Sequence, residues 1–157
     1  MKKTNAARIL DKHKIPYELH EYKVDEDDLS AAHVAEILNI DAKNIFKTLL
    51  LLDENNIPLV ACIPGDDELD LKKLAKSAKC KRCTMLPLKD LLKTTGYVRG
   101  GCSVIGMKKQ FRTFMDKSAQ EHEKIFLSAG VRGQQLHIDP KDLEKLFDIT
   151  FADLISK

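Results

Sequence analysis

No hydrophobic run in this sequence of 157 residues is long enough to cross a membrane. The longest apolar stretch is IFKTLLLL, residues 45–52, whereas a membrane helix needs about 20 predominantly apolar residues. The beginning of the chain, MKKTNAARIL, also lacks the apolar core of an export signal. We therefore expect a cytoplasmic protein without a membrane anchor.

Cysteine is scarce, and a chain without an export signal is not expected to build a disulfide framework. Cys80 and Cys83 form a lone C-x-x-C motif, whereas a zinc site would need a second pair of ligands at a suitable spacing. The other candidate ligands are Cys62, Cys102, His13, His20, His33, His122 and His137. They supply no such pair, so we predict no metal site and no cofactor. Free structural thiols are the favoured interpretation, and a redox role for Cys80 and Cys83 is the alternative.

The chain also lacks an excess of charge, because its 26 basic and 24 acidic residues give a net charge of +2. Tight binding to nucleic acid usually needs a strongly basic surface. One basic segment stands out, LKKLAKSAKCKR at 71–82. A solvated helix face is the favoured interpretation of this segment, and a phosphate-binding patch is the alternative.

The sequence contains enough apolar residues for a substantial core, with 43% hydrophobic and 32% charged residues. Helical spacing and capping residues predict helices over 4–13 and 31–38, after Asp70, and over 87–95, 141–147 and 150–157. Apolar and alternating runs predict strands over 16–22, 45–52, 59–63, 112–116, 124–129 and 135–139.

Strands in adjacent hairpins, with helices scattered between them, do not follow a regular βαβ alternation. We therefore predict the α/β class in its mixed α+β form. The expected architecture is a single compact domain, residues 1–157, with a mixed, partly barrel-like β-sheet surrounded by helices.

Lys47 is unexpected in the apolar strand over 45–52. Successive strand residues point to opposite faces, and both faces of this strand are mostly apolar, as in a strand that is covered on both sides. One interpretation is that Lys47 extends past the edge of the core to water. The other is that its ammonium group points into a pocket and meets an anion or a carbonyl there, because a buried lysine without a partner is driven towards its neutral form.

Four of the seven glycines fall between 96 and 106, in GYVRGGCSVIG. The pattern is not G-x-G-x-x-G, and although Gly101 and Gly106 have the Walker spacing, Met107 follows where lysine is required. Both nucleotide motifs are therefore rejected. A tight structural turn and a ligand-binding loop both fit the composition.

No catalytic triad is evident in the sequence. Ser103, Ser128 and Thr48 have none of the motif contexts of a nucleophile, such as G-x-S-x-G. The histidines of the predicted strands and helices are interpreted as partly buried or surface residues rather than general bases.

Six segments taken together resemble the YbaK/EbsC family of aminoacyl-tRNA deacylases, and also the editing domain of bacterial prolyl-tRNA synthetases. They are IPYELHEY, IFKTLLL, LDLKKLAK, TTGYVRGGCSVIG, TFMD and LSAGVRG, and the resemblance covers nearly the whole chain. It implies that residues 1–157 form one editing domain. It also implies removal of a wrongly attached amino acid from the 3′ end of tRNA, most typically cysteine from tRNA(Pro).

In the cysteinyl branch of this family the thiol of the substrate attacks its own ester carbonyl, so the protein supplies no covalent nucleophile. The resemblance implies that Lys47 holds the terminal adenosine or the ester. It also implies that the backbone N–H groups of Gly100 and Gly101 face the carbonyl oxygen as charge develops.

The substrate-binding positions that the resemblance implies are Tyr22, Ser30, Thr48, Ser103, Asp116, Ser128, Gly130 and Arg132. A structural ion pair is the alternative for Asp116 and Arg132. The chain departs from the family pattern at Ser30, where many relatives have an aromatic residue that can stack on adenine, and at Val104, where many have proline.

The implied partners are the 3′ end of an aminoacyl-tRNA and a prolyl-tRNA synthetase, and the sequence indicates no oligomeric state. Three alternatives stay open. The protein could clear alanine or another amino acid with water as the nucleophile, it could bind tRNA or a synthetase without turnover, or it could act through the thiols of Cys80 and Cys83.

Overall fold

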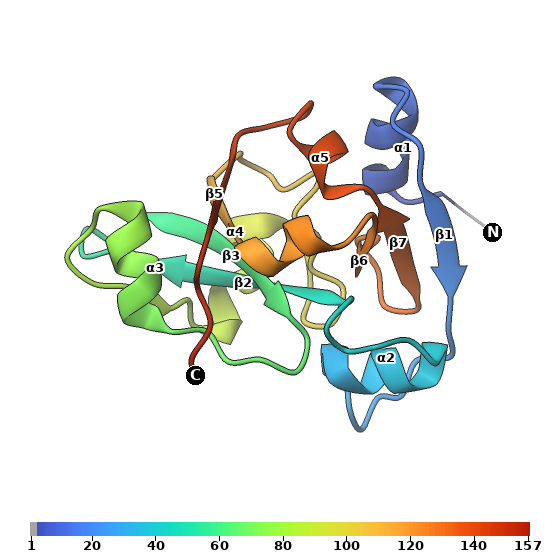
Figure 1. The fold of residues 1–157 in the computed structure, drawn as a ribbon, viewed down its shortest axis with the longest axis horizontal. Helices are drawn as coiled ribbons and strands as arrows, with labels where there is room; N and C mark the ends of the chain where they lie inside the picture. The colour runs from blue at the N-terminus through green and yellow to red at the C-terminus, as the bar shows by residue number, and fades with distance from the viewer. Residues whose placement is uncertain (1–2) are drawn as a thin grey trace.

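An antiparallel hairpin forms the centre of the larger of two sheets in the computed structural model, which describes residues 3–157 (Figure 1). Its strands are β2 (Phe46–Leu52) and β3 (Pro58–Pro64). The carboxylate of Asp53 accepts hydrogen bonds from the N–H groups of Asn55 and Ile57 and closes the turn between them. The hairpin predicted from the sequence is therefore confirmed.

Three further strands complete this sheet. β5 (Arg112–Asp116) runs parallel to β3, and β8 (Ile149–Ala152) runs parallel to β5. β4 (Thr84–Met85) pairs with the end of β2, so the strand order is β4-β2-β3-β5-β8. The prediction of a helix over 150–157 is wrong, because this segment begins inside β8, where the free edge of β5 supplies backbone partners.

The smaller sheet is antiparallel and has the order β1-β7-β6. It contains β1 (Glu18–Glu21), β6 (Ile125–Ser128) and β7 (Gln134–Ile138). A bridge between Ile45 and Phe126 joins it to the start of β2. The mixed α+β class is confirmed, and over residues 3–157 its strands form two sheets of which neither closes into a barrel.

The helices begin at the capping residues that the sequence offers. Thr4, Ser30 and Asp70 each accept a backbone N–H at the first turn of a helix. These helices are α1 (Asn5–Lys12), α2 (Ala31–Leu38) and α3 (Leu71–Ala78). No helix among residues 3–157 has the length and apolar character needed to span a membrane, and the cytoplasmic location stays a prediction.

The later helical segments are shorter than predicted. The segment over 87–95 divides into η1 (Leu88–Asp90) and α4 (Leu91–Thr95), which ends at Gly96 in the left-handed conformation. The segment over 141–147 contains only the end of α5 (Pro140–Leu143). A 3₁₀ turn, η2 (Lys117–Glu121), follows β5 and was not predicted.

Both faces of β2 are covered, as its apolar pattern predicted. Phe46 and Leu50 pack into one core with residues of the smaller sheet and α1. Leu51 packs into a second core beneath α3, where it contacts the cluster that contains Leu74. Figure 1 shows α3 at one end of the larger sheet and α1 with the smaller sheet at the other.

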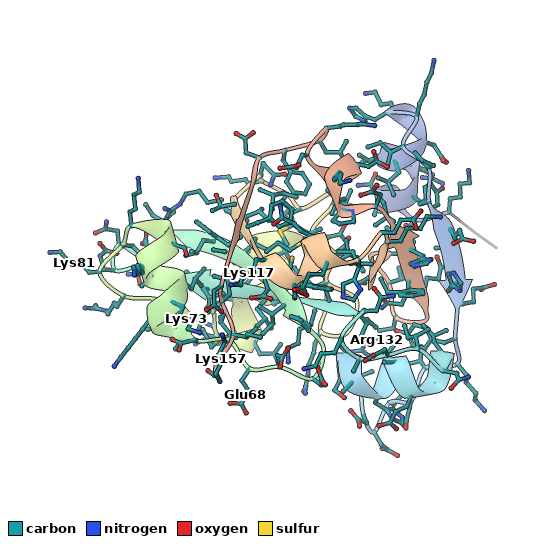
Figure 2. All side chains as sticks on the ribbon, in the orientation of Figure 1. Glu68, Lys73, Lys81, Lys117, Arg132 and Lys157 are labelled. Atoms are coloured by element: carbon teal, nitrogen blue, oxygen red, sulfur yellow. The ribbon has the colours of Figure 1, made fainter. Side chains whose placement is uncertain are left out.

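The basic segment over 71–82 contains α3, and several of its lysines lie on the outer side of this helix. Lys72, Lys76 and Lys81 are exposed, and Figure 2 shows Lys81 pointing away from the molecule. Lys73 instead donates to the carboxylate of Asp153 at 3.0 Å. A solvated helix face, which was the favoured interpretation, describes this arrangement.

Candidate active site

The edge of β2 that faces away from β3 is only partly covered. β4 pairs with Leu51 and Leu52 at one end, and the bridge between Ile45 and Phe126 lies at the other. Between these points a cavity of about 360 Å³ opens beside the strand, which is within the usual size range of small-molecule sites. The uncovered edge explains why side chains from both faces of β2 reach one cavity.

Backbone groups of β2 also face this cavity. On the cavity side, the carbonyl oxygen of Leu50 accepts from the N–H of Leu86 at 3.0 Å, and on the β3 side the carbonyl oxygen of Ile45 accepts from Gly65. Because successive strand residues direct their N–H and C=O groups to opposite edges, Thr48 presents both groups at the uncovered edge. The cavity therefore has a backbone donor and a backbone acceptor on one side.

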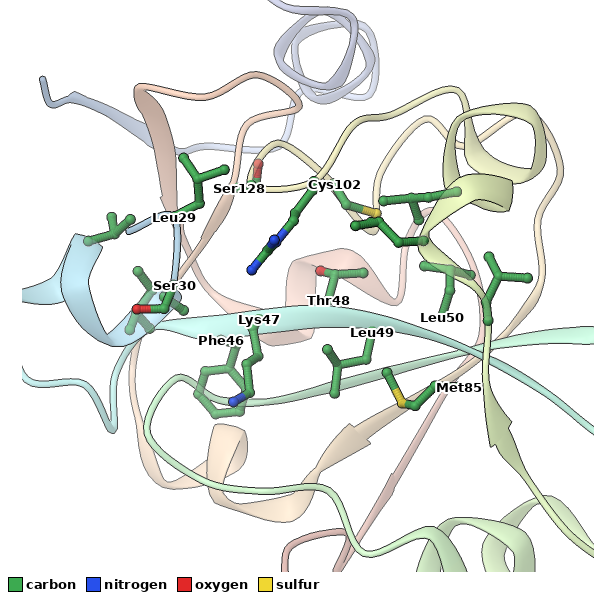
Figure 3. A pocket seen from close by; sticks show the side chains of 18 of the residues that line it. Leu29, Ser30, Phe46, Lys47, Thr48, Leu49, Leu50, Met85, Cys102 and Ser128 are labelled. Carbon is green, nitrogen blue, oxygen red and sulfur yellow. The ribbon is translucent and has the colours of Figure 1, made fainter. Parts of the chain in front are cut away.

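Lys47 lines this cavity and is half-buried. Its Nζ donates to the carbonyl oxygen of Gly65 at 3.3 Å. Figure 3 shows Lys47 and Leu49 on one side of β2 and Thr48 and Leu50 on the other. Lys47 therefore lies at a pocket, and the interpretation that its ammonium group meets a ligand there stays a prediction.

The electrostatic surroundings of Lys47 are mixed. Burial lowers the pKa of Lys47 below the usual lysine value, and the carboxylates of Asp67, Asp66 and Glu68 oppose this shift. Its hydrogen-bond acceptor is a single carbonyl oxygen, so the ammonium group keeps further donors for a ligand. The side chain is therefore suited to bind an ester or phosphate oxygen.

The glycine-rich segment over 96–106, here called the glycine loop, forms the opposite wall of the cavity. Gly100 lines the cavity and has a φ of +83°, a conformation that favours glycine. Gly101 does not line it, and its N–H donates to the carbonyl oxygen of Val98 at 3.0 Å. A Cβ at Gly101 would lie 3.1 Å from the backbone of Arg132. Gly101 is therefore explained by close backbone packing, whereas Gly100 contacts the cavity.

Arg132 holds the glycine loop in place from outside the cavity. Its Nε donates to the carbonyl oxygen of Arg99 at 2.8 Å, and its guanidinium group pairs with Glu26 at 3.1 Å. Figure 2 shows Arg132 beside α2. Asp116 lies elsewhere and accepts the N–H groups of Ser118 and Leu154. Asp116 and Arg132 therefore do not pair with each other, but Arg132 does form a structural ion pair, with Glu26.

The structure brings five of the predicted site residues together around the cavity. They are Ser30, Lys47, Thr48, Gly100 and Ser128. The other predicted residues lie outside its lining and are Tyr22, Gly101, Ser103, Asp116, Gly130 and Arg132.

Three of these outer residues have structural contacts of their own. The hydroxyl of Ser103 is buried and accepts the N–H of Ile105 at 3.2 Å. Tyr22 packs on the cluster that contains Phe126. Gly130 has a φ of +103°, and a Cβ there would meet the ring of Tyr97 at 3.1 Å.

Sequence reasoning missed several residues of the cavity. The most informative is Gln135, whose side chain lines the cavity, is buried and leaves its Oε1 without a hydrogen-bond partner. Buried polar atoms are nearly always hydrogen-bonded, so an unpaired one marks a place for a ligand or water. The sequence offers little signal, because β7 reads QQLHI and Gln135 is one of three polar residues in it, and only the pairing of Gln135 with Ser128 places it at the cavity.

Among its described lining residues, the cavity contains no nucleophile that is paired with a general base. Lys47 and Arg99 are its charged residues, and the lining contains no histidine or carboxylate. Burial raises the pKa of the Cys102 thiol to about 12, so this thiol stays protonated. The hydroxyl of Ser128 accepts the N–H of Gly130 at 3.1 Å. The cavity therefore supplies cations and backbone dipoles around a mostly aliphatic wall.

The thiols of Cys80 and Cys83 lie outside this cavity. Their sulfur atoms are 3.4 Å apart, beyond the C-terminal end of α3. Burial, together with the hydrogen bond between the two thiols, raises the pKa of Cys83 to about 12. Cys83 is therefore a protonated thiol of low reactivity at neutral pH.

Comparison with known proteins assigns a family to this fold and cavity. The family model described as "Aminoacyl-tRNA editing domain" matches residues 25–146. Over 155 residues, the chain is 50% identical to a protein of Enterococcus faecalis named "Putative Cys-tRNA(Pro)/Cys-tRNA(Cys) deacylase EbsC", covering 99% of this chain and 94% of that protein. The chain belongs to the family of aminoacyl-tRNA editing domains, and the resemblance predicted from the sequence is confirmed.

Two further comparisons concern a longer protein and a solved structure. The chain is 32% identical over 126 residues to a proline–tRNA ligase of Geotalea daltonii, covering 80% of this chain and 21% of the ligase. The structure of the hypothetical protein APE2540 superimposes with a TM-score of 0.88 at 19% identity, covering 98% of this chain and all of that one. The second likeness concerns the fold alone.

We predict that Arg132→Ala loosens the glycine loop. Loss of a hydrogen bond from a charged donor costs about 1.5–3 kcal/mol, so the amide hydrogen of Gly101 should exchange at least about tenfold faster in a native-state exchange experiment. Glu26→Gln is the matched control, because it removes an exposed ion pair of little energetic value and keeps the bond to Arg99. An equal effect of both substitutions would contradict this role of Arg132.

Proposed function

We propose that this protein cleaves the ester bond of mischarged aminoacyl-tRNA, with Cys-tRNA(Pro) as its main substrate. Membership of the editing family supports the reaction class, and the relative of E. faecalis carries the name of a cysteinyl-tRNA deacylase. The observation on which the proposal depends is the composition of the cavity. It combines Lys47 and Gly100 with an aliphatic wall, and no nucleophile is paired with a general base among its lining residues.

The absence of that pair favours a reaction in which the substrate provides the nucleophile. The cysteine thiol attacks its own ester carbonyl, a C–S bond forms, the C–O bond to the terminal ribose breaks, and the thiol proton ends on the ribose oxygen. The products are a cyclic thioester and free tRNA. Proximity of well-oriented groups can lower such a barrier by about 7–11 kcal/mol, so the main task of the protein is to hold the ester in a reactive shape.

Three residues of the cavity have a task in this proposal. Lys47 binds an oxygen of the ester or of the terminal nucleotide, in place of its weak bond to Gly65. The N–H of Gly100 faces the carbonyl oxygen as negative charge develops, while Gly101 fixes the turn through Val98. The unpaired Oε1 of Gln135 accepts a hydrogen bond from the α-ammonium group of the amino acid.

The low net charge of the chain favours a larger partner that supplies contacts to tRNA. The net charge of +2 provides few contacts for the body of a tRNA. A similar segment occupies about a fifth of the proline–tRNA ligase of G. daltonii. We therefore include in the proposal that a prolyl-tRNA synthetase presents the charged 3′ end to this domain.

We predict that Lys47→Ala lowers the rate of Cys-tRNA(Pro) deacylation by about 10- to 100-fold, which corresponds to one hydrogen bond from a charged group. The matched control is Lys43→Ala, because Lys43 is exposed and pairs with Asp66 and Asp67 outside the cavity. Single-turnover deacylation measures both variants. Wild-type rates for Lys47→Ala would show that this side chain has no part in the reaction.

Gly100→Ala tests the glycine loop. Gly100 and Gly96 have φ values of +83° and +87°, so alanine at either position should cost about 1–2 kcal/mol of stability. Gly100 lines the cavity, where the new Cβ would meet Leu29 at 3.3 Å, whereas Gly96 faces the flexible side chain of Lys108. We expect similar urea unfolding curves and a loss of deacylation in Gly100→Ala alone. Equal activity of the two variants would argue against a contact between Gly100 and the substrate.

Product analysis on a panel of charged tRNAs tests the identity of the nucleophile. We expect cysteine to leave as a cyclic thioester and seryl-tRNA to resist cleavage, because serine keeps the shape of cysteine and lacks the thiol. Faster clearance of Ala-tRNA(Pro), with free alanine as the product, would assign the reaction to water. Binding without clearance of any charged tRNA would replace the enzyme by a binding module.

A further inference from the structure

Three metal-ligating side chains gather on the smaller sheet, away from the β2 edge. Glu18 and His20 are two residues apart on β1, and His137 lies directly opposite Glu18 on β7. Because strand side chains alternate, all three point to the same face. One ligand atom from each lies within 4.8 Å of the other two. The sequence predicted no metal site because these histidines are far apart along the chain.

Two polar atoms, one in this cluster and one from a neighbouring residue, are buried without a hydrogen-bond partner. They are Nε2 of His20 and Oδ1 of Asn44. Asn44 and His137 also line a shallow cavity of about 370 Å³. Buried unpaired polar atoms call for water or an ion, so His20 has a ring nitrogen without a partner and Asn44 has an unpaired amide oxygen beside the same cavity as His137.

Phe126 fixes the orientation of both imidazole rings. It stacks on His137 with ring centres 4.0 Å apart and planes 10° apart, and it meets His20 edge-on at 5.2 Å. Glu18 is the mobile member, because its side chain is 59% exposed. Donor atoms of a tetrahedral zinc site lie roughly 3.4 Å apart, so the three ligand atoms, which lie within 4.8 Å of one another, have to move closer together when an ion binds.

We propose that Glu18, His20 and His137 bind one divalent transition-metal ion of the zinc class. Two imidazole nitrogens and one carboxylate are a common ligand set for Zn²⁺, and water completes the tetrahedron. The ion joins β1 to β7 next to Gln135, which lies opposite His20. The site is separate from the proposed deacylation chemistry and requires no substrate.

The charges around the cluster set the affinity for the ion. Nδ1 of His137 lies 3.0 Å from a carboxylate oxygen of Glu18, and Nζ of Lys124 lies 3.8 Å from the same oxygen. The carboxylate of Glu18 therefore has an imidazole nitrogen and an ammonium group as neighbours. Lys124 repels an incoming cation, and its removal should strengthen binding.

The test is a titration of the untagged protein with zinc chloride at about pH 7.5, where a typical imidazole is neutral. A Cys80→Ser, Cys83→Ser background removes the thiol pair, which can itself bind zinc. We expect one bound Zn²⁺ per chain by calorimetry and at least about tenfold weaker binding in His20→Ala and in His137→Ala. Lys124→Met should bind more tightly. The matched control is His13→Ala, because His13 is exposed at the end of α1 and should have no effect.

Glu18→Gln keeps the test decisive if a histidine variant unfolds, because this exposed position tolerates an amide and the loss of the charge still weakens binding. Cobalt substitution provides a second measurement, in which nitrogen and oxygen ligands give visible bands without thiolate charge transfer. Unchanged affinity in the Glu18, His20 and His137 variants would overturn the proposal, and so would no binding at about 1 mM zinc. Neither result bears on deacylation, which is measured separately.

Discussion

The structure depends on which elements pair with the two edges of β2, a strand that is covered on both faces. β3 covers one edge of β2 along its whole length, whereas the other edge is divided between a single bridge to Phe126 and the two residues of β4. A buried strand edge needs partners for its backbone groups. The gap around Thr48 therefore creates a polar opening in an otherwise apolar core, and the cavity is located at this opening.

The same gap explains a lysine in an apolar strand. A full strand along this edge of β2 would add neighbours beside Lys47 and bury it further, and the cost of burying an unpaired ammonium group is high. At the gap it is half-buried, its pKa is lowered by burial, and its acceptor is a single carbonyl oxygen. The lining residues of this site include such a cation but no nucleophile paired with a general base. The site is therefore suited to bind and orient an ester.

The smaller sheet provides two different chemical surfaces on one face. Ser128 and Gln135 pair across β6 and β7 at the cavity, and Glu18 and His137 pair across β1 and β7 further along. The opposite face carries residues such as Leu127 and Leu136, which are fully buried in the main core. Strand alternation therefore places Ser128, Gln135, Glu18 and His137 on the face opposite Leu127 and Leu136.

Local sequence determined much of this protein. The capping residues of α1, α2 and α3, the turn at Asp53 and the apolar pattern of β2 and β3 depend on neighbouring residues, and the motif order indicated the family. Tertiary structure alone decided the rest, because edges and distances between remote segments are not encoded in local patterns. The end of the chain became a strand at the free edge of β5. Gly100 reached the cavity while Gly101 packed against the segment of Arg132, and Gln135 reached the cavity through its pairing with Ser128.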